Sequence, residues 1–134
     1  MCPYRGDSVQ SPAASRSSIP ATSWDTYFAL AECRFVGEKY DDAIQLDDKI
    51  AHAYVGTLEE ILALKHICEC QIQLTQRDPG QLERAYATWQ AISDKLPQLG
   101  DDAFVGRPVS QSRAELEAWV RNTKSFLESV RVTH

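Results

Sequence analysis

The stretch His66-Ile67-Cys68-Glu69-Cys70 brings a histidine and two cysteines together within five residues. On a helix, His66 and Cys70 would face the same way, which is the spacing of two ligands of one metal ion. Cys68 would point about 160° away from Cys70. A third ligand would have to come from Cys33 or His52, and no second close pair of metal-binding residues occurs. We therefore predict no metal site, with a packed cysteine and a partly exposed histidine.

Acidic residues come in adjacent pairs at positions 41–42, 47–48, 59–60 and 101–102. A di-iron bundle needs Glu-x-x-His motifs, and no acid stands three residues before a helical histidine. Neighbouring acids on a helix point about 100° apart, so we expect these pairs to lie on solvated faces. No glycine-rich phosphate loop or nucleophile turn is present either. The sequence predicts no catalytic residue and no cofactor, and therefore no enzyme.

Composition narrows the class of protein further. The chain has 134 residues, of which 43% are apolar and 25% charged, as in an ordinary globular domain. Its net charge of −5 argues against nucleic acid as a partner, since that requires a basic face. No apolar run approaches the ~18 residues of a membrane span. The first thirty residues lack a secretory signal, so we expect a cytoplasmic protein with reduced cysteines.

Residues 1–22 are rich in serine, alanine and proline and show no apolar periodicity. Such a segment cannot bury enough apolar surface to offset the entropy lost on ordering. We predict a tail that is disordered or held by a partner.

Five helical patterns follow the tail. The first begins after Ser23 and ends at Gly37, and the second runs from about residue 40 to 55. Thr57 with Glu60 forms a capping box for a third helix that ends near residue 76. Asp78-Pro79 is expected to start the fourth, which ends before residue 97.

A long connection at 97–111 precedes the last helix, at 112–131, which a second capping box (Ser112 with Glu115) begins. No segment alternates with period two for long enough to form a strand, so the fold class is all-α. Short connections make consecutive helices antiparallel. Two architectures satisfy this: stacked helical hairpins, or an up-down bundle of four or five helices.

Internal similarity favours the hairpins. Aligning Tyr40 with Leu82, an offset of 42 residues, also aligns Ala43 with Ala85 and apolar positions farther along both helices. A small residue at the aligned alanine positions would let the two helices of a hairpin cross closely. We therefore expect Ala43 and Ala85 to lie at helix crossings.

The residues of this pattern resemble a tetratricopeptide repeat: Leu30, Ala31, Cys33, Gly37, Tyr40, Ala43 and Ile50, with "GEKYDDAI" at the turn and "GQLERAYATWQAI" as the later copy. The usual repeat is about 34 residues, and the longer offset resembles the long-helix variants of kinesin light chains. The resemblance covers residues 23–96 and implies a short array closed by a capping helix at 112–131. The usual proline is missing at Gly56, and only two units are visible.

The resemblance implies a non-catalytic adaptor that binds a partner peptide or helix on its surface. The chaperone-binding members use asparagine in a carboxylate clamp, and the one asparagine here, Asn122, lies outside the repeat. Two alternatives stay open: a structural accessory subunit of a large complex, and a small helical enzyme or metal-binding bundle. The candidate partner-binding residues are Tyr27, Arg34, Lys65, His66, Glu69, Gln73 and Phe104.

Overall fold

The computed structural model describes residues 24–105 and 112–133, and the predicted tail lies outside them. The described residues form five α-helices and two short 3₁₀ turns and contain no strand, which confirms the all-α prediction. Their bounds are α1 (Trp24–Val36), α2 (Tyr40–Ala53), α3 (Leu58–Leu74), α4 (Gln81–Lys95), η3 (Leu96–Gln98), η4 (Asp101–Phe104) and α5 (Arg113–Thr133).

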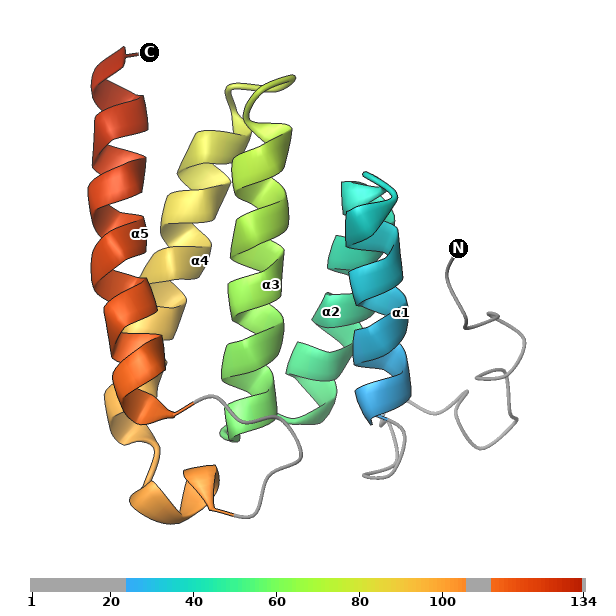
Figure 1. Cartoon of the computed structure of the whole chain (residues 1–134), viewed down its shortest axis with the longest axis vertical. Coiled ribbons are helices and arrows are strands. Elements are labelled where there is room, and N and C mark those ends of the chain that lie inside the picture. The colour runs from blue at the N-terminus through green and yellow to red at the C-terminus, as the bar shows by residue number, and fades with distance from the viewer. Residues whose placement is uncertain (1–23, 106–111, 134) are drawn as a thin grey trace.

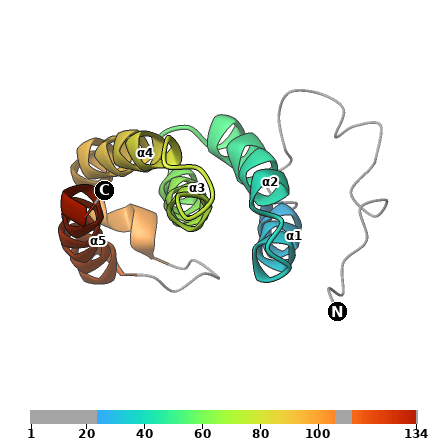
Figure 2. The same cartoon turned by 90° about the horizontal axis from the view of Figure 1, so that it is seen from above.

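The helices stand side by side in an open row, with α1 at one end and α5 at the other (Figure 1). Each helix packs mainly against the next one along the chain. Seen from above, the row zigzags between two layers: α1, α3 and α5 lie in one, and α2 and α4 in the other (Figure 2). The layer of α1, α3 and α5 carries most of the side chains discussed below.

Local sequence accounts for most helix ends. The side-chain oxygen of Thr57 accepts from the Glu60 amide (3.4 Å), and the Glu60 carboxylate accepts from the Gly56 amide (2.9 Å). The Ser112–Glu115 box is fully reciprocal, with distances of 3.1 and 2.9 Å. The Ser112–Glu115 capping box therefore forms as predicted. Only the Thr57 half of the other box forms, because Glu60 bonds to Gly56 while the Thr57 amide donates to the Tyr54 carbonyl (3.2 Å).

Two predicted helix boundaries need correction. α4 begins at Gln81 and not at Pro79, because the Asp78 carboxylate accepts from the Gly80 amide (3.1 Å) and forms a turn before the helix. After α1, the left-handed backbone conformation falls at Glu38 (φ 61°) and not at the expected Gly37. Gly56, which follows α2, does adopt it (φ 83°).

The core consists of two clusters that meet at α3. One joins α1, α2 and α3 through Tyr27, Ile50, Ala51 and Ala63. The other joins α3, α4 and α5 around Ile61, Ile92, Leu116 and Leu127. The indole of Trp89 donates to the Val120 carbonyl (2.8 Å) and fastens α4 to α5. An open row needs two such clusters because α1 and α5 are too far apart to share one.

Ala43 and Ala85 are both fully buried. At Ala85 the neighbouring helix comes close, since the Cys68 thiol of α3 lies 3.5 Å from the Ala85 carbonyl of α4. Leucine at either alanine would overpack the contact, and we expect it to lower the free energy of unfolding by about 1–3 kcal/mol. Leucine at exposed Ala87 should change it little. Urea unfolding of the three leucine variants measures these effects. Midpoints equal to that of the parent chain at both Ala43 and Ala85 would contradict close helix crossings.

Candidate functional site

A buried acid–base pair joins α2 to α3. Asp47 is fully buried, His66 is 3% exposed, and a hydrogen bond links Nδ1 of His66 to Oδ2 of Asp47. Three expectations are wrong: Asp47 does not lie on a solvated face, His66 is not partly exposed, and the acidic pair Glu59–Glu60 is buried as well. Asp48 does point to solvent, because adjacent helical residues face about 100° apart.

The surroundings of the pair shift both pKa values. Burial raises the pKa of Asp47 to about 6, although the hydrogen bond and charge of His66 act to lower it. Burial acts to lower the pKa of His66, but Asp47 and the carboxylates of Glu32 and Glu69 raise it above its ordinary value. The folded protein therefore holds a proton on this pair more tightly than the unfolded chain does.

The outer edge of His66 faces α1. Nε2 lies 3.4 Å from Oε1 of Glu32, but neither Nε2 nor Oδ1 of Asp47 has a hydrogen-bond partner. The rings of Phe28 and Phe35 pack against the imidazole, with centroids 5.7 and 5.2 Å away. A carboxylate that orients a histidine is typical of a general base. However, no hydroxyl or thiol of the described residues bonds to Nε2 to act as a nucleophile.

The cysteines at positions 68 and 70, within the described residues, give no sign of reactivity or metal binding. Cys68 and Cys70 are free and fully buried, and burial raises the pKa of each thiol to about 12. Cys33 is disulfide-bonded, which corrects the expectation of a reduced thiol at this position. Within 24–105 and 112–133, no three His, Cys, Asp or Glu side chains converge to hold a metal ion.

A hollow of about 260 Å³ lies beside the pair, between α1 and α3. We call it the acidic hollow. Its walls carry two carboxylates, an imidazole, an aromatic ring, an isoleucine and an amide: Glu32, Glu69, His66, Phe35, Ile72 and Gln73.

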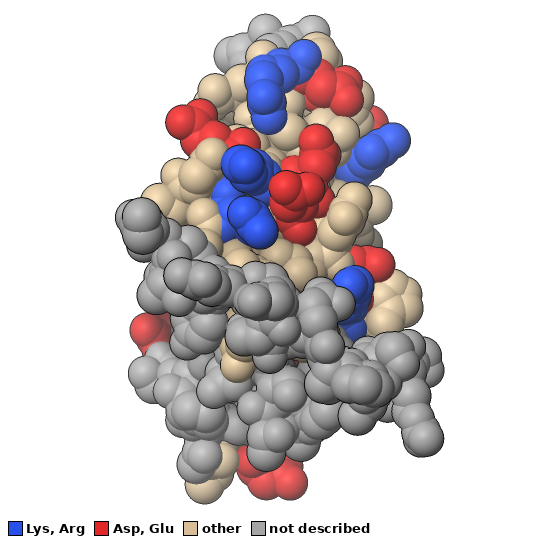
Figure 3. Space-filling view, turned by 90° about the vertical axis from the view of Figure 1, so that its right-hand side faces the viewer, with Lys and Arg blue, Asp and Glu red and all other residues tan. Residues whose placement is uncertain are grey.

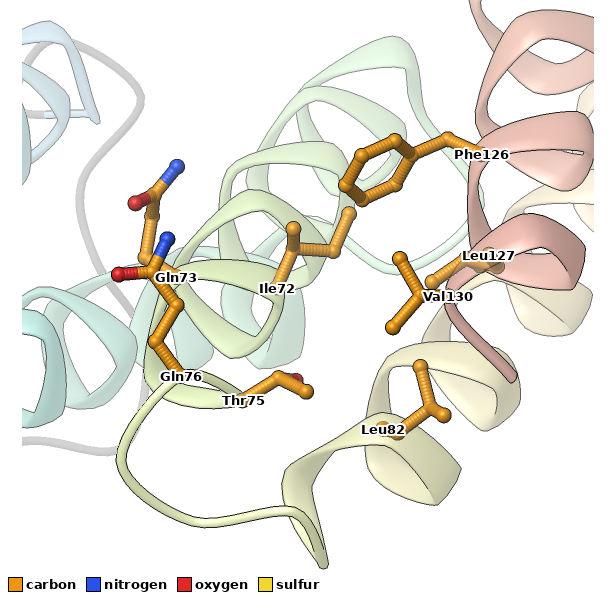
Figure 4. A pocket seen from close by; sticks show the side chains of 8 residues that line it. All are labelled: Ile72, Gln73, Thr75, Gln76, Leu82, Phe126, Leu127 and Val130. Atoms are coloured by element: carbon orange, nitrogen blue, oxygen red, sulfur yellow. The ribbon is translucent and has the colours of Figure 1, made fainter. Parts of the chain in front are cut away.

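A second hollow, of about 210 Å³, lies between α3, α4 and α5. We call it the apolar hollow, and Figure 4 shows its lining: Ile72, Gln73, Thr75, Gln76, Leu82, Phe126, Leu127 and Val130. Ile72 points toward the ring of Phe126 across it (Figure 4). Phe126 is 48% exposed, which is unusual for so large an apolar side chain.

The two hollows adjoin, because Ile72 and Gln73 line both. Together the two hollows span α1, α3 and α5, the three helices of one layer, and we call the pair of hollows the groove. One end of the groove is acidic and the other apolar.

The candidate residues from the sequence divide into two groups. His66, Glu69 and Gln73 line the groove. Arg34 lines neither of its hollows, and Tyr27 is 7% exposed and belongs to the core.

Lys65 and Phe104 lie beside α5 and are engaged within the chain. The Lys65 ammonium is 3.7 Å from Glu69 and 5.8 Å from the centre of the Trp119 ring. The Phe104 ring lies under the Arg113 guanidinium, 4.8 Å from its centroid.

The face in Figure 3 shows no broad field of one sign among its described residues. On the face in Figure 3, lysine and arginine side chains are interleaved with aspartate and glutamate among the coloured residues. None of the described helices is both long and apolar enough to cross a membrane.

Comparison with protein-family models, with curated proteins and with solved structures gave no match to this chain. The groove and the acid–base pair beside it are therefore the features that bear on function.

Proposed function

We propose that the protein is a non-catalytic interaction module that binds a segment of a partner protein in the groove across α1, α3 and α5. The observation that carries the proposal is that Ile72 and Gln73 line both hollows, so the two hollows adjoin on one layer of helices. Adjoining hollows that can each take an anchoring side chain suit an extended peptide or a helix.

The arrangement of the helices supports an array of hairpins of the tetratricopeptide kind. Consecutive helices alternate between two layers, and α1 and α5 do not close on each other (Figure 2). In such arrays the helices of one layer present the binding surface. The groove lies on the layer that contains the first helix of each hairpin.

The size of the hollows favours side chains of a partner over a free small molecule. Small-molecule sites usually enclose about 300–1,000 Å³, and these hollows measure about 210 and 260 Å³. Each hollow can therefore take one anchoring side chain. The exposed ring of Phe126 beside Ile72 offers the apolar contact that such an anchor needs.

Selection of random displayed peptides on the immobilised full chain tests the proposal. We expect selected peptides to bind the parent chain. Their affinity for the Phe126→Asp or the Gln73→Trp variant should be at least about tenfold lower. The first variant places a charge in the apolar hollow, and the second fills the junction. Because both residues are partly exposed, the variants should remain folded, which circular dichroism checks.

The matched control is Val132→Asp, which changes an apolar residue on α5 that is 85% exposed and outside the groove. Peptides that bind all variants equally would contradict the proposal, as would failure to select any peptide. A parent chain that dimerises in sedimentation and dissociates as Phe126→Asp would also overturn it, since the groove would then bind a second copy of this chain.

A further inference from the structure

Building on the proposed function, we propose that the acidic hollow is a subsite for a guanidinium group, the side chain of an arginine in the bound segment. The inference rests on three features of the hollow: the unsatisfied Nε2 atom of His66, the flanking carboxylates of Glu32 and Glu69, and the aromatic ring of Phe35.

His66 has a nitrogen atom directed toward the hollow. Its side chain is 4% exposed, and Nδ1 is occupied by Asp47. Since the two ring nitrogens lie on different edges of the imidazole, Nε2 points away from α2, toward Glu32 and the hollow. Buried polar atoms normally have hydrogen-bond partners, and Nε2 has none. An orphan of this kind marks a position where a ligand can complete the contacts.

The charges around the hollow favour a cation. Glu32 on α1, Asp47 on α2 and Glu69 on α3 provide three carboxylates, against the Lys65 ammonium and a protonated His66. One negative charge remains in excess even with both bases charged. Glu32 is 55% exposed, so it can turn from His66 to an incoming group. An anionic segment would be repelled.

The aromatic wall favours guanidinium over ammonium. Phe35 lines the hollow, and its ring centroid lies 5.4 Å from that of Tyr40 and 5.2 Å from that of His66. A guanidinium group is planar, stacks on aromatic rings and hydrogen-bonds to carboxylates with two parallel donors. A lysine ammonium lacks both the planar face and the paired donors.

Binding should be coupled to the proton on His66. Glu32, Asp47 and Glu69 are the charged groups that stabilise the imidazolium. A guanidinium group that pairs with the Glu32 carboxylate withdraws that carboxylate from the imidazolium and adds a positive charge nearby. Binding therefore releases protons, and affinity rises with pH across the range in which His66 titrates.

Capped arginine and its neutral isostere capped citrulline, titrated into the full chain, provide the test. The signals to follow are the ring nitrogens of His66 in NMR spectra, assigned by elimination with His52→Leu and His134→Leu variants, since the chain has three histidines. We expect capped arginine to shift these signals saturably and to lower the apparent pKa of His66, while capped citrulline does neither. Glu32→Gln should weaken binding by about tenfold, as expected for the loss of a charge-assisted hydrogen bond.

Glu117→Gln is the control, because Glu117 is an exposed carboxylate on α5 outside the acidic hollow. Equal responses to both ligands, or unchanged binding by Glu32→Gln, would overturn the subsite. The two proposals can fail separately. If capped arginine binds at His66 but the selected peptides bind Phe126→Asp as well as the parent chain, only the guanidinium subsite is supported. If the selected peptides require Phe126 but capped arginine leaves the His66 signals unchanged, only peptide binding in the groove is supported.

Discussion

Replacing His66 with leucine is expected to lower the free energy of unfolding by about 3–5 kcal/mol at pH 8. The substitution preserves most of the side-chain volume but leaves the fully buried carboxylate of Asp47 without its donor and its counter-charge. Oδ1 of Asp47 already has no hydrogen-bond partner, so the carboxylate would then have none at either oxygen.

The His66→Leu variant should itself be less stable at pH 8 than at pH 5. The folded-state pKa of Asp47 is raised from 3.8 to about 6, so the folded state binds its proton more tightly than the unfolded state does. Stability from such a group is present in acid and is lost as pH rises through the folded-state pKa. Without His66, which lowers this pKa, the decline extends to higher pH.

Urea unfolding at both pH values measures the effect. His52→Leu is the matched control, because the His52 side chain is 74% exposed and should tolerate the change. The double variant Asp47→Val, His66→Leu should recover most of the loss, since it removes both polar groups. A His66→Leu loss no larger than that of His52→Leu would contradict the pairing.

Replacing Leu127 with alanine is expected to cost about 2–5 kcal/mol of unfolding free energy. Leu127 is fully buried in the cluster that joins α3, α4 and α5. Because α5 is at the end of the row, its apolar contacts come from one side only. Truncating Leu127 therefore removes a large share of the apolar contacts that hold α5 against α3 and α4.

Its neighbour Phe126 provides an internal comparison. Phe126 is the larger side chain, but it is 48% exposed at the edge of the apolar hollow, so alanine there should cost about 1 kcal/mol or less. Denaturant midpoints at equal m-values decide between the two cases. A larger loss of unfolding free energy for Phe126→Ala than for Leu127→Ala would show that the Phe126 ring belongs to the core and does not line an open groove.

The sequence predicts the helices well because their signals are local. The box at Ser112 and Glu115 satisfies amides within one turn, and apolar residues recur at helical spacing regardless of what they pack against. Where several local options compete, the prediction was wrong. Asp78 could cap a helix directly or form a turn with Gly80, and it forms the turn.

The site was harder to predict because its members come from different helices. His66 attracted attention for its spacing from Cys70, but its partner Asp47 lies nineteen residues earlier, on α2. Nothing in the Asp47-Asp48 pair indicates which acid is buried. The stripe of Ala43, Ile50 and Leu46 on the same helix was the available signal, since Asp47 lies within that face.

Phe126 was missed for a related reason. It stands one position before Leu127 of the apolar stripe of α5, so periodicity alone places it at the edge of the core. Its role in the groove depends on Ile72 and Gln73 of α3, more than fifty residues away in the chain.

Backbone amide shifts of the isotopically labelled full chain, followed while a selected peptide is added, test whether the partner segment binds in the groove. We expect the shifted amides to lie on α1, α3 and α5 and to include Ile72, Gln73 and Phe126. Amides on the outer faces of α2 and α4 should not move. Shifts centred on α2 and α4, with Ile72 and Gln73 unchanged, would contradict the groove as the binding surface.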